Sequence, residues 1–173
     1  SGGVTGAGNL TLNNLGLAAN VINLTGNAIN HTGSLTVQGT ATGDTNIGAD
    51  IGENVTSVTQ ASATSSLVLS GNNGYTGDTT ISAGTLRLGA ADVIPNGAGK
   101  GNVSVSGTID LNGFSETING LSGGGVVDNT AASTNTVLTL SAGSIFSGTI
   151  QNSGAPLTLV KGPAGGVILT GNN

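Results

Sequence analysis

The sequence predicts an all-β protein folded as an elongated β-solenoid, and three features of the chain support this prediction. Gly, Thr, Asn and Ser make up more than half of the chain, whereas only 6% of the residues are charged. Short segments with the pattern apolar–polar–apolar recur along the whole chain. Several of these segments follow one another at intervals of roughly 20 residues, which is close to the length of one coil of a β-helix.

The composition disfavours helices and a compact globular core. Gly accounts for 32 residues, and each Gly inside a helix would destabilise it by about 1 kcal/mol. Val, Ile and Leu make up about a quarter of the chain, and Thr is also common, so residues that favour strands are abundant. Tyr75, Phe114 and Phe146 are the only aromatic residues. We therefore expect a narrow aliphatic core along an extended molecule.

Ten segments show the alternation that is typical of half-buried strands. In each one, two apolar side chains flank a residue that is usually polar, so both apolar groups lie on one face of the strand. The ten segments are Leu10-Thr11-Leu12, Ile22-Asn23-Leu24, Leu35-Thr36-Val37, Leu67-Val68-Leu69, Leu86-Arg87-Leu88, Val103-Ser104-Val105, Ile109-Asp110-Leu111, Leu138-Thr139-Leu140, Leu157-Thr158-Leu159 and Val167-Ile168-Leu169. We expect each of them to form a short strand with one face in the core.

The intervals between these segments indicate coils. Three pairs of segments begin roughly 20 residues apart, and their first residues are Leu67 and Leu86, Leu86 and Val103, and Leu138 and Leu157. One coil of a three-sided β-helix needs about 18 to 25 residues, because it holds three short strands and their turns. A single coil cannot bury its own apolar row and must stack on the next. At roughly 20 residues per coil, the chain makes about eight coils of parallel strands.

Four Asn-Gly pairs supply corners for such coils, because both residue types tolerate positive φ angles. These pairs are Asn73-Gly74, Asn96-Gly97, Asn112-Gly113 and Asn119-Gly120. The same dipeptide also marks tight β-hairpins. An antiparallel β-sandwich is therefore the alternative fold.

The composition also excludes several classes of protein. The chain has no Cys and cannot form a disulfide scaffold. No apolar run approaches the roughly 20 residues of a membrane-spanning helix, so we expect no membrane insertion of this segment. With 3 basic and 8 acidic residues, the chain lacks the positive surface that nucleic-acid binding requires. It begins at Ser1 without a leader segment, so we interpret it as a processed product or a segment of a longer chain.

An internal repeat makes the prediction more specific. Residues 67–73 recur as residues 167–173 with only chemically similar exchanges, and the first copy continues through Gly74-Tyr75-Thr76-Gly77 to Gly84-Thr85-Leu86-Arg87-Leu88-Gly89. Residues 67–89 resemble the passenger-associated transport repeat of autotransporter proteins, also called the autotransporter-associated β-strand repeat. Residues 109–123 resemble the second half of that repeat. The resemblance is therefore best over residues 67–125, and residues 157–173 resemble the beginning of another copy.

This resemblance implies a right-handed parallel β-helix within a passenger that a bacterium secretes or displays on its surface. Such repeats are linked to transport of the passenger through the outer membrane and are not catalytic. We interpret residues 1–173 as a single β-solenoid domain. Within it we expect divergent coils at residues 1–66, transport-repeat-like coils at residues 67–125, and coils that end in the start of another repeat at residues 126–173.

The two ends of the solenoid are candidate assembly surfaces. An uncapped solenoid exposes unpaired strand edges and an apolar row at each end, which favours the addition of further coils. The residues that we expect at these assembly ends are Leu10, Leu12, Val167, Leu169, Asn172 and Asn173. We expect either head-to-tail self-association or continuation into a longer chain.

Candidate catalytic and metal-binding residues are sparse. His31 is the single His and has no acidic residue within a dozen positions, so we expect an exposed loop residue and no catalytic triad. Asp44, Asp50 and Glu53 are the densest acidic group and form a weak candidate for a Ca²⁺ site, but their spacing does not match a calcium loop. We expect these three residues to lie in a solvated loop, and we expect neither a metal nor a cofactor.

An enzymatic β-helix that cleaves polysaccharides would need clustered acidic side chains. Asp110 and Glu116 could approach each other across a turn, with Arg87 one coil away. Two carboxylates beside one cation are more typical of a surface ion pair. A polysaccharide lyase or hydrolase is therefore a remote alternative, and we do not expect an enzyme.

These observations together predict a non-enzymatic, extracellular structural protein that forms a stiff stalk or a self-stacking filament on a bacterial surface. The alternative is an adhesin that binds host or matrix glycans through exposed loops at residues 40–66 or 90–101. We expect the outward Thr, Ser and Asn side chains to form ladders that support the stack. The same ladders could present a flat polar surface to a glycan.

Overall fold

The computed structural model describes residues 3–16 and 19–171, and within these residues it contains strands but no helix. The strands form three sheets, and all pairings between the named strands are parallel. Parallel pairing confirms the predicted β-solenoid and excludes the antiparallel β-sandwich. The described part of the chain includes no helix with the length and apolar character needed to cross a membrane.

The three sheets lie on different sides of the molecule; the first two run along the whole described chain, whereas the third is confined to its C-terminal part. The first sheet consists of β1 (Leu10–Asn14), β3 (Gly33–Gly39), β5 (Val55–Gln60), β7 (Thr79–Ile81), β9 (Val103–Val105), β12 (Leu121–Gly123), β15 (Ser144–Phe146) and β18 (Val167–Leu169). The second sheet consists of β2 (Ile22–Leu24), β4 (Thr45–Ile47), β6 (Ser66–Leu69), β8 (Thr85–Leu88), β10 (Thr108–Asp110), β13 (Val126–Asp128) and β16 (Thr149–Ile150). The third sheet consists of β11 (Glu116–Ile118), β14 (Thr136–Leu140) and β17 (Leu157–Lys161).

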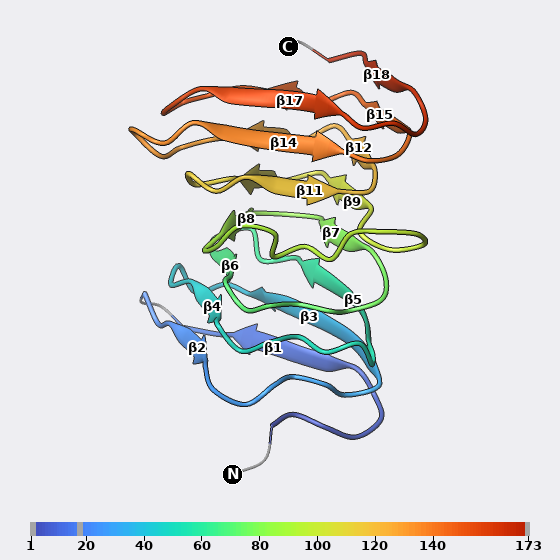
Figure 1. Cartoon of the computed structure of the whole chain (residues 1–173). Coiled ribbons are helices and arrows are strands. Elements are labelled where there is room, and N and C mark those ends of the chain that lie inside the picture. The colour runs from blue at the N-terminus through green and yellow to red at the C-terminus, as the bar shows by residue number, and fades with distance from the viewer. Residues whose placement is uncertain (1–2, 17–18, 172–173) are drawn as a thin grey trace.

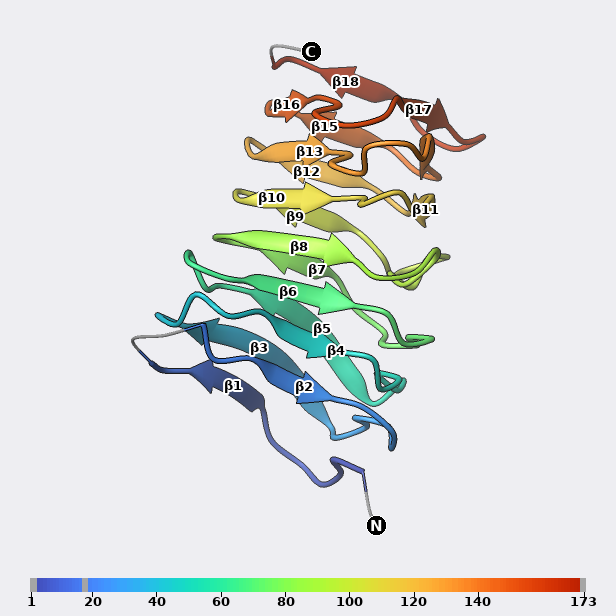
Figure 2. The same cartoon turned by 90° about the vertical axis from the view of Figure 1, so that its left-hand side faces the viewer.

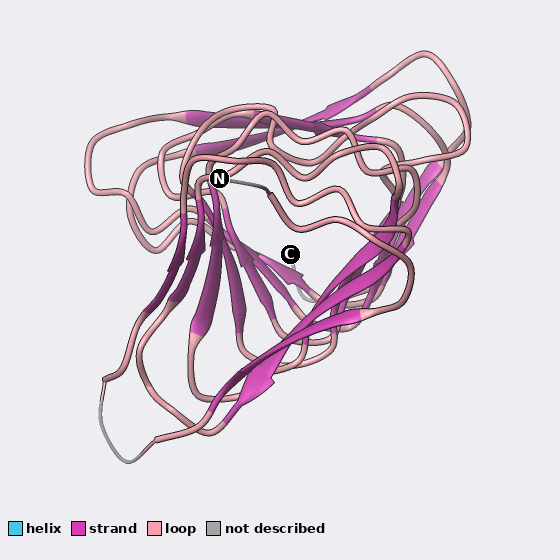
Figure 3. Ribbon diagram, turned by 90° about the horizontal axis from the view of Figure 1, so that it is seen from below, coloured by secondary structure: helices cyan, strands magenta, loops and turns pink. Residues whose placement is uncertain are grey.

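Each coil passes through three sides in turn, so the strands of one sheet stack along the axis (Figure 1). Figure 2 faces the second sheet, whose strands lie one above another from the N-terminal to the C-terminal end. The view along the axis shows a three-sided cross-section (Figure 3). Viewed from the N-terminal end in Figure 3, the chain turns clockwise as it recedes, which makes the solenoid right-handed, as the resemblance implies.

Coil length varies along the solenoid. The coil that separates Leu10 from its partner Leu35 is longer than the coil that separates Val103 from its partner Leu121. Both coils fall within the predicted range of about 18 to 25 residues, which confirms that range. The eight strands of the first sheet are connected by seven turns of the chain, close to the eight coils expected from the sequence.

Spacing in the sequence singles out three pairs of segments. In two of these pairs, the first residues of the two segments are not paired with each other in the structure. Leu67 pairs with Leu86, as their spacing predicts. Leu86 pairs next with Ile109 and not with Val103, because Val103 belongs to another side of the solenoid. Leu138 pairs with Leu159, which lies slightly beyond the predicted partner. The apolar–polar–apolar pattern is the same on all three sides, so interval alone could not separate them.

The core is a narrow aliphatic column enclosed by the three sides. Alternate strand residues such as Leu35, Val58, Leu67 and Leu86 are fully buried. Phe146 and Tyr75 are the largest buried side chains, and the Tyr75 hydroxyl lies 2.6 Å from Thr79 Oγ1. Burying one such aliphatic or aromatic side chain contributes about 1.5–3 kcal/mol, so the core supplies much of the stability.

Corners between strands depend on residues that accept unusual backbone angles. Gly84 has a φ of +63°, and a Cβ atom at this position would collide with the Ser62 carbonyl of the preceding coil. Asn112 and Gly113 both have positive φ angles, as the Asn-Gly pattern predicts for a corner. Coils can therefore approach each other at these corners without backbone strain. The proposed division into residues 1–66, 67–125 and 126–173 stays a prediction.

Candidate interaction surfaces

The outer face of the first sheet carries a continuous column of hydroxyl side chains. The residues paired in register along this column are Thr11, Thr36, Thr59, Thr80, Ser104 and Ser122. Each is the polar residue between two inward positions, so the strand alternation directs it outward. Ile145 and Ile168 continue the column at its C-terminal end and are 64% and 53% exposed.

This hydroxyl column lies on strands without charged side chains, although the exposed Asp78 lies beside it, two residues before Thr80. None of the eight strands of the first sheet contains an acidic or basic residue. Neighbouring strands are spaced about 4.8 Å apart, so the column repeats a small hydrogen-bonding group at that interval. The column is therefore a regular row of neutral side chains on a stack of paired strands.

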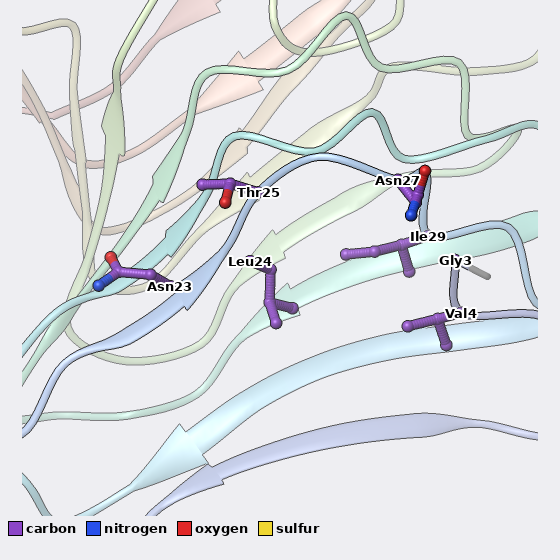
Figure 4. A pocket seen from close by; sticks show the side chains of 7 residues that line it. All are labelled: Gly3, Val4, Asn23, Leu24, Thr25, Asn27 and Ile29. Carbon is purple, nitrogen blue, oxygen red and sulfur yellow. The ribbon is translucent and has the colours of Figure 1, made fainter. Parts of the chain in front are cut away.

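The N-terminal end of the solenoid is hollow. Val4, Leu24 and Ile29 face a common space with a volume of about 260 Å³, which Gly3, Asn23, Thr25 and Asn27 also line (Figure 4). Val4 and Leu24 are only partly buried, whereas Ile29, which lies one coil further in than Val4, is 1% exposed. The hollow is therefore the uncovered end of the aliphatic core.

The C-terminal end also leaves apolar core positions uncovered. Leu169 belongs to the same inward column as Phe146, which is fully buried, yet Leu169 is 39% exposed. Val167, Leu157 and Leu159 are only partly buried. These residues lack cover because no further coil lies above them in the described chain.

The apolar residues of the first sheet that we predicted at the two assembly ends lie in the same two inward columns. Leu10 and Val167 lie in one inward column of the first sheet, at β1 and β18 respectively, and Leu12 and Leu169 lie in the next. A further coil added to either end would therefore meet apolar side chains at matching positions. Asn172 and Asn173, also predicted at the assembly ends, lie outside the described residues.

Most acidic side chains connect neighbouring coils. Six of the eight acidic residues accept a hydrogen bond from a backbone N–H of an adjacent coil. These residues are Asp44, Asp50, Asp78, Asp110, Glu116 and Asp128. A carboxyl oxygen is a good acceptor, and a stronger one when the group is ionised, so each bond satisfies a corner N–H that the strand ladders leave unpaired.

Asp44, Asp50 and Glu53, the weak candidate for a Ca²⁺ site, have separate contacts. Asp44 accepts from the Ser66 N–H at 3.0 Å, and Asp50 accepts from the Asn72 N–H at 2.8 Å. The Glu53 side chain is exposed. Within the described residues, no group of three His, Cys, Asp or Glu side chains has the arrangement of a metal site. The first two carboxylates therefore act as links between coils.

Arg87 lies one coil from Asp110, as the sequence suggested. Its Nε donates to Asp110 Oδ2 at 3.1 Å, and its Nη1 lies 3.8 Å from Asp44 Oδ2. Asp110 is 1% exposed and also accepts from the N–H groups of Thr130 and Asn112. Both carboxylate oxygens of Asp110 already have hydrogen-bond partners. Arg87 and Asp110 therefore form an ion pair that supports the fold.

Glu116 points into the core and does not share a site with Asp110. It is 1% exposed, and its Oε2 accepts from the Val93 N–H at 2.9 Å. Burial, against the opposing effect of the Val93 hydrogen bond and with a smaller contribution from the nearby Asp92 carboxylate, raises the pKa of Glu116 to about 8. The predicted approach of Glu116 to Asp110 is therefore not seen, and its oxygens are engaged within the fold.

The Asp128 carboxylate has a different environment. Partial burial acts to raise its pKa, but hydrogen bonds from the Ser153 N–H, Gln151 Nε2 and Ser153 Oγ outweigh burial and lower the pKa below its ordinary value. Asp128 is therefore held as an anion at the corner between two coils.

His31 is buried, contrary to the expectation of an exposed loop residue. It is 3% exposed, and its Nε2 donates to the Ser34 carbonyl at 3.1 Å. Its Nδ1 is buried without a hydrogen-bond partner in the described part of the chain. The turn before β3 points the ring inward, which sequence alone did not indicate. No acidic side chain among the described residues orients the ring, so the triad remains without structural support.

The two segments proposed as binding loops differ in the structure. Residues 40–66 contain β4 and β5, which pair with both neighbouring coils, so this segment is part of the stack. Between β8 and β9, by contrast, the chain swings out beyond the stack (Figure 1). Residues 96–99 of this segment are exposed, and Gly97, Gly99 and Gly101 have positive φ angles. Of the two predicted segments, only residues 90–101 therefore include a loop that leaves the stack of coils.

Comparisons with known proteins agree with this architecture. Residues 64–88 match the family model described as the passenger-associated-transport-repeat. The chain is also 34% identical over 111 residues to the adhesin BmaC autotransporter of Brucella suis biovar 1 (strain 1330). This alignment covers 64% of the chain but about 3% of that much longer relative. No solved structure matches the chain. The sequence resemblance over residues 67–89 is thereby confirmed.

Proposed function

Since the chain is a β-solenoid segment that resembles an autotransporter passenger and carries a transport repeat, we propose that it forms a stiff stalk within a secreted or surface-displayed bacterial adhesin. The observation that carries this proposal is the stack of parallel coils with uncovered core columns at both ends. Each coil contacts only its neighbours, so such a stack can be extended without changing its design. Its role is mechanical and non-enzymatic.

The mechanical role is supported by how the coils are joined. Backbone ladders run along two sides of the whole described stack and along the third side of its C-terminal part, and six acidic side chains link corner N–H groups between coils. These acidic side chains form hydrogen bonds with other parts of the fold. This arrangement favours stiffness and leaves few acidic groups available for acid–base chemistry.

The uncovered ends receive further coils, from a second copy or from the continuing chain. Light scattering over a range of concentrations tests self-stacking. We expect the wild-type particle mass to rise with concentration, because Leu169 and Leu12 offer apolar columns in matching positions. Leu169→Lys should abolish this rise, since it places a charge in the inward column.

Ile168→Lys is the matched control. Ile168 neighbours Leu169 but faces outward on β18, so its substitution should leave end-to-end stacking unchanged. A wild-type chain that remains monomeric at high concentration contradicts self-stacking and leaves continuation of the chain as the route of extension. Negative-stain images of the same samples should show filaments in the first case and short rods in the second.

The hydroxyl column of the first sheet favours a second function, binding of a neutral glycan. A polysaccharide also repeats hydroxyl groups along its length, and contact with a column of neutral side chains avoids the cost of desolvating charges. Affinity would come from many weak contacts along the column. Binding to an array of neutral glycans tests this function.

Thr59→Lys and Thr80→Lys should weaken glycan binding because they place charges in the middle of the column. Thr139→Lys, on the outer face of the third sheet, is the matched control. Equal binding by all three variants would exclude the hydroxyl column as the binding face.

A further inference from the structure

The four Asn-Gly pairs of the chain have very different surroundings, and this difference has chemical consequences. When Gly follows Asn, the Gly backbone nitrogen can attack the carbonyl carbon of the Asn side chain, because Gly has no side chain to obstruct the approach. The attack requires an Asn side chain that can rotate and a Gly N–H that is not held in a hydrogen bond. Both conditions can be compared across the four pairs.

Asn96-Gly97 meets both conditions. Asn96 is exposed, and neither its side-chain amide nor the Gly97 N–H forms a hydrogen bond with the described residues. Gly97 has a φ of +119°, and a Cβ placed on it would meet only the Lys100 Cε, at 4.0 Å. The pair lies in the segment that swings out between β8 and β9, away from the strand ladders (Figure 1).

In Asn73-Gly74, hydrogen bonds hold both the Asn side chain and the Gly N–H. Asn73 is 9% exposed; its Oδ1 accepts from the Ile51 N–H at 2.9 Å and its Nδ2 donates to the Val93 carbonyl at 2.8 Å. The Gly74 N–H donates to the Ile51 carbonyl at 2.7 Å. Reaction at this pair requires local opening of the stack.

Asn112-Gly113 and Asn119-Gly120 are also restrained. Asn112 Nδ2 donates to the Leu88 carbonyl at 3.0 Å, and the Gly113 N–H donates to Asn129 Oδ1 at 2.9 Å. Asn119 Nδ2 donates to Asn102 Oδ1 at 2.8 Å, so this side chain is held in a ladder between coils. Three of the four pairs are thus protected by contacts that the folded stack provides.

We propose that Asn96 is a site of spontaneous deamidation in the folded protein. The Gly97 nitrogen forms a bond to Asn96 Cγ, the Cγ–Nδ2 bond breaks, and the side-chain nitrogen leaves as ammonia with the proton that Gly97 loses. The product is a five-membered succinimide. Water then adds across one of the two imide bonds and yields aspartate or isoaspartate. The step needs water but no oxidant, reductant or cofactor.

Deamidation would change the most exposed part of this loop without disturbing the coils. Either product adds one negative charge to a chain whose formal net charge is −5. The isoaspartate product also lengthens the backbone by one methylene group. Because residues 96–99 lie outside the strands, the ladders on both sides can stay intact.

Peptide mapping of the intact chain after incubation in mildly alkaline buffer tests the proposal. Denaturing digestion with trypsin releases residues 88–100, a peptide whose single Asn is Asn96. We expect this peptide to gain the mass difference between an amide and an acid about tenfold faster than peptides reporting the other three pairs, since those need local opening first. An antibody or enzyme specific for isoaspartate identifies the second product.

Two controls separate the fold from the dipeptide itself. In urea, all four pairs should react at similar rates, because no contact then protects any of them. Asn96→Gln should abolish the change in the 88–100 peptide, since its longer side chain does not form the five-membered ring. Equal rates at all four pairs in the folded chain, or an unmodified Asn96 in the folded chain, would overturn the proposal.

Discussion

At the scale of single residues, acidic side chains that resemble catalytic or metal-binding candidates in the sequence serve as links between coils. Asp110 illustrates this, because its two oxygens accept from Arg87, Thr130 and Asn112 at once. The sequence predicted the neighbour Arg87, one coil away. It did not predict the backbone partners or the burial of Glu116 and His31, since these depend on which corner faces which coil.

Removing the Asp110 carboxylate should destabilise the fold. Asp110→Ala leaves the N–H groups of Thr130 and Asn112 without their acceptor, and a buried unsatisfied donor costs about 1–3 kcal/mol. Urea unfolding followed by circular dichroism measures the loss. Glu53→Ala is the control at an exposed acidic residue and should change the free energy of unfolding by less than about 0.5 kcal/mol. Equal effects of the two substitutions would refute the structural role of Asp110.

Glu116 should make the protein less stable as the pH rises. Its pKa is raised to about 8 in the folded state from an ordinary value of 4.5, so between these values the folded state holds a proton that the unfolded state has lost. The free energy of unfolding should therefore fall by up to about 5 kcal/mol across this interval and level off above it.

Unfolding experiments between mildly acidic and mildly alkaline pH measure this loss. Glu116→Gln carries no titrating group at this position and should flatten the dependence on pH. The proposed cause is wrong if the variant shows the same decline as the wild type.

At the scale of secondary-structure elements, the sequence predicted strands wherever two apolar residues flank a polar one. All ten predicted segments coincide with strands, except that β10 ends at Asp110, just before the predicted end at Leu111. Strands such as β7, β12 and β15 were not predicted, because Thr, Ser or Gly occupies one of their inward positions. In a stack, the paired strands above and below stabilise a segment whose own pattern is weak.

Trypsin should cut the segment between β8 and β9 before it cuts β8. Lys100 follows Gly97 and Gly99 in the exposed turn outside the ladders, whereas Arg87 lies within β8, which pairs on both sides. Limited proteolysis of the folded chain, followed by mass spectrometry, should show cleavage after Lys100 well before cleavage after Arg87. Cleavage after both residues at the same rate would show that β8 opens as readily as the loop.

At the scale of the whole molecule, the described residues form a stack of similar coils whose first and last coils leave equivalent core columns uncovered. The composition predicted this architecture well: a chain rich in Gly, Asn, Thr and Ser, with few aromatics, suits a narrow core with many corners. The lengths of individual coils were harder to predict, because they differ from one coil to the next and the three sides share one sequence pattern. The neutral hydroxyl column of the first sheet could be recognised only from the register between its strands.

Distances along the hydroxyl column test the stacked architecture most directly. The chain has no Cys, so Thr36→Cys combined with Thr80→Cys, Ser104→Cys or Ser122→Cys places spin labels at unique pairs of positions. These partners lie two, three and four strands from Thr36. Electron-spin distance measurements should give backbone separations near 10, 14 and 19 Å, at about 4.8 Å per strand. Separations that do not increase steadily in this order would contradict the β-solenoid and the stalk function that rests on it.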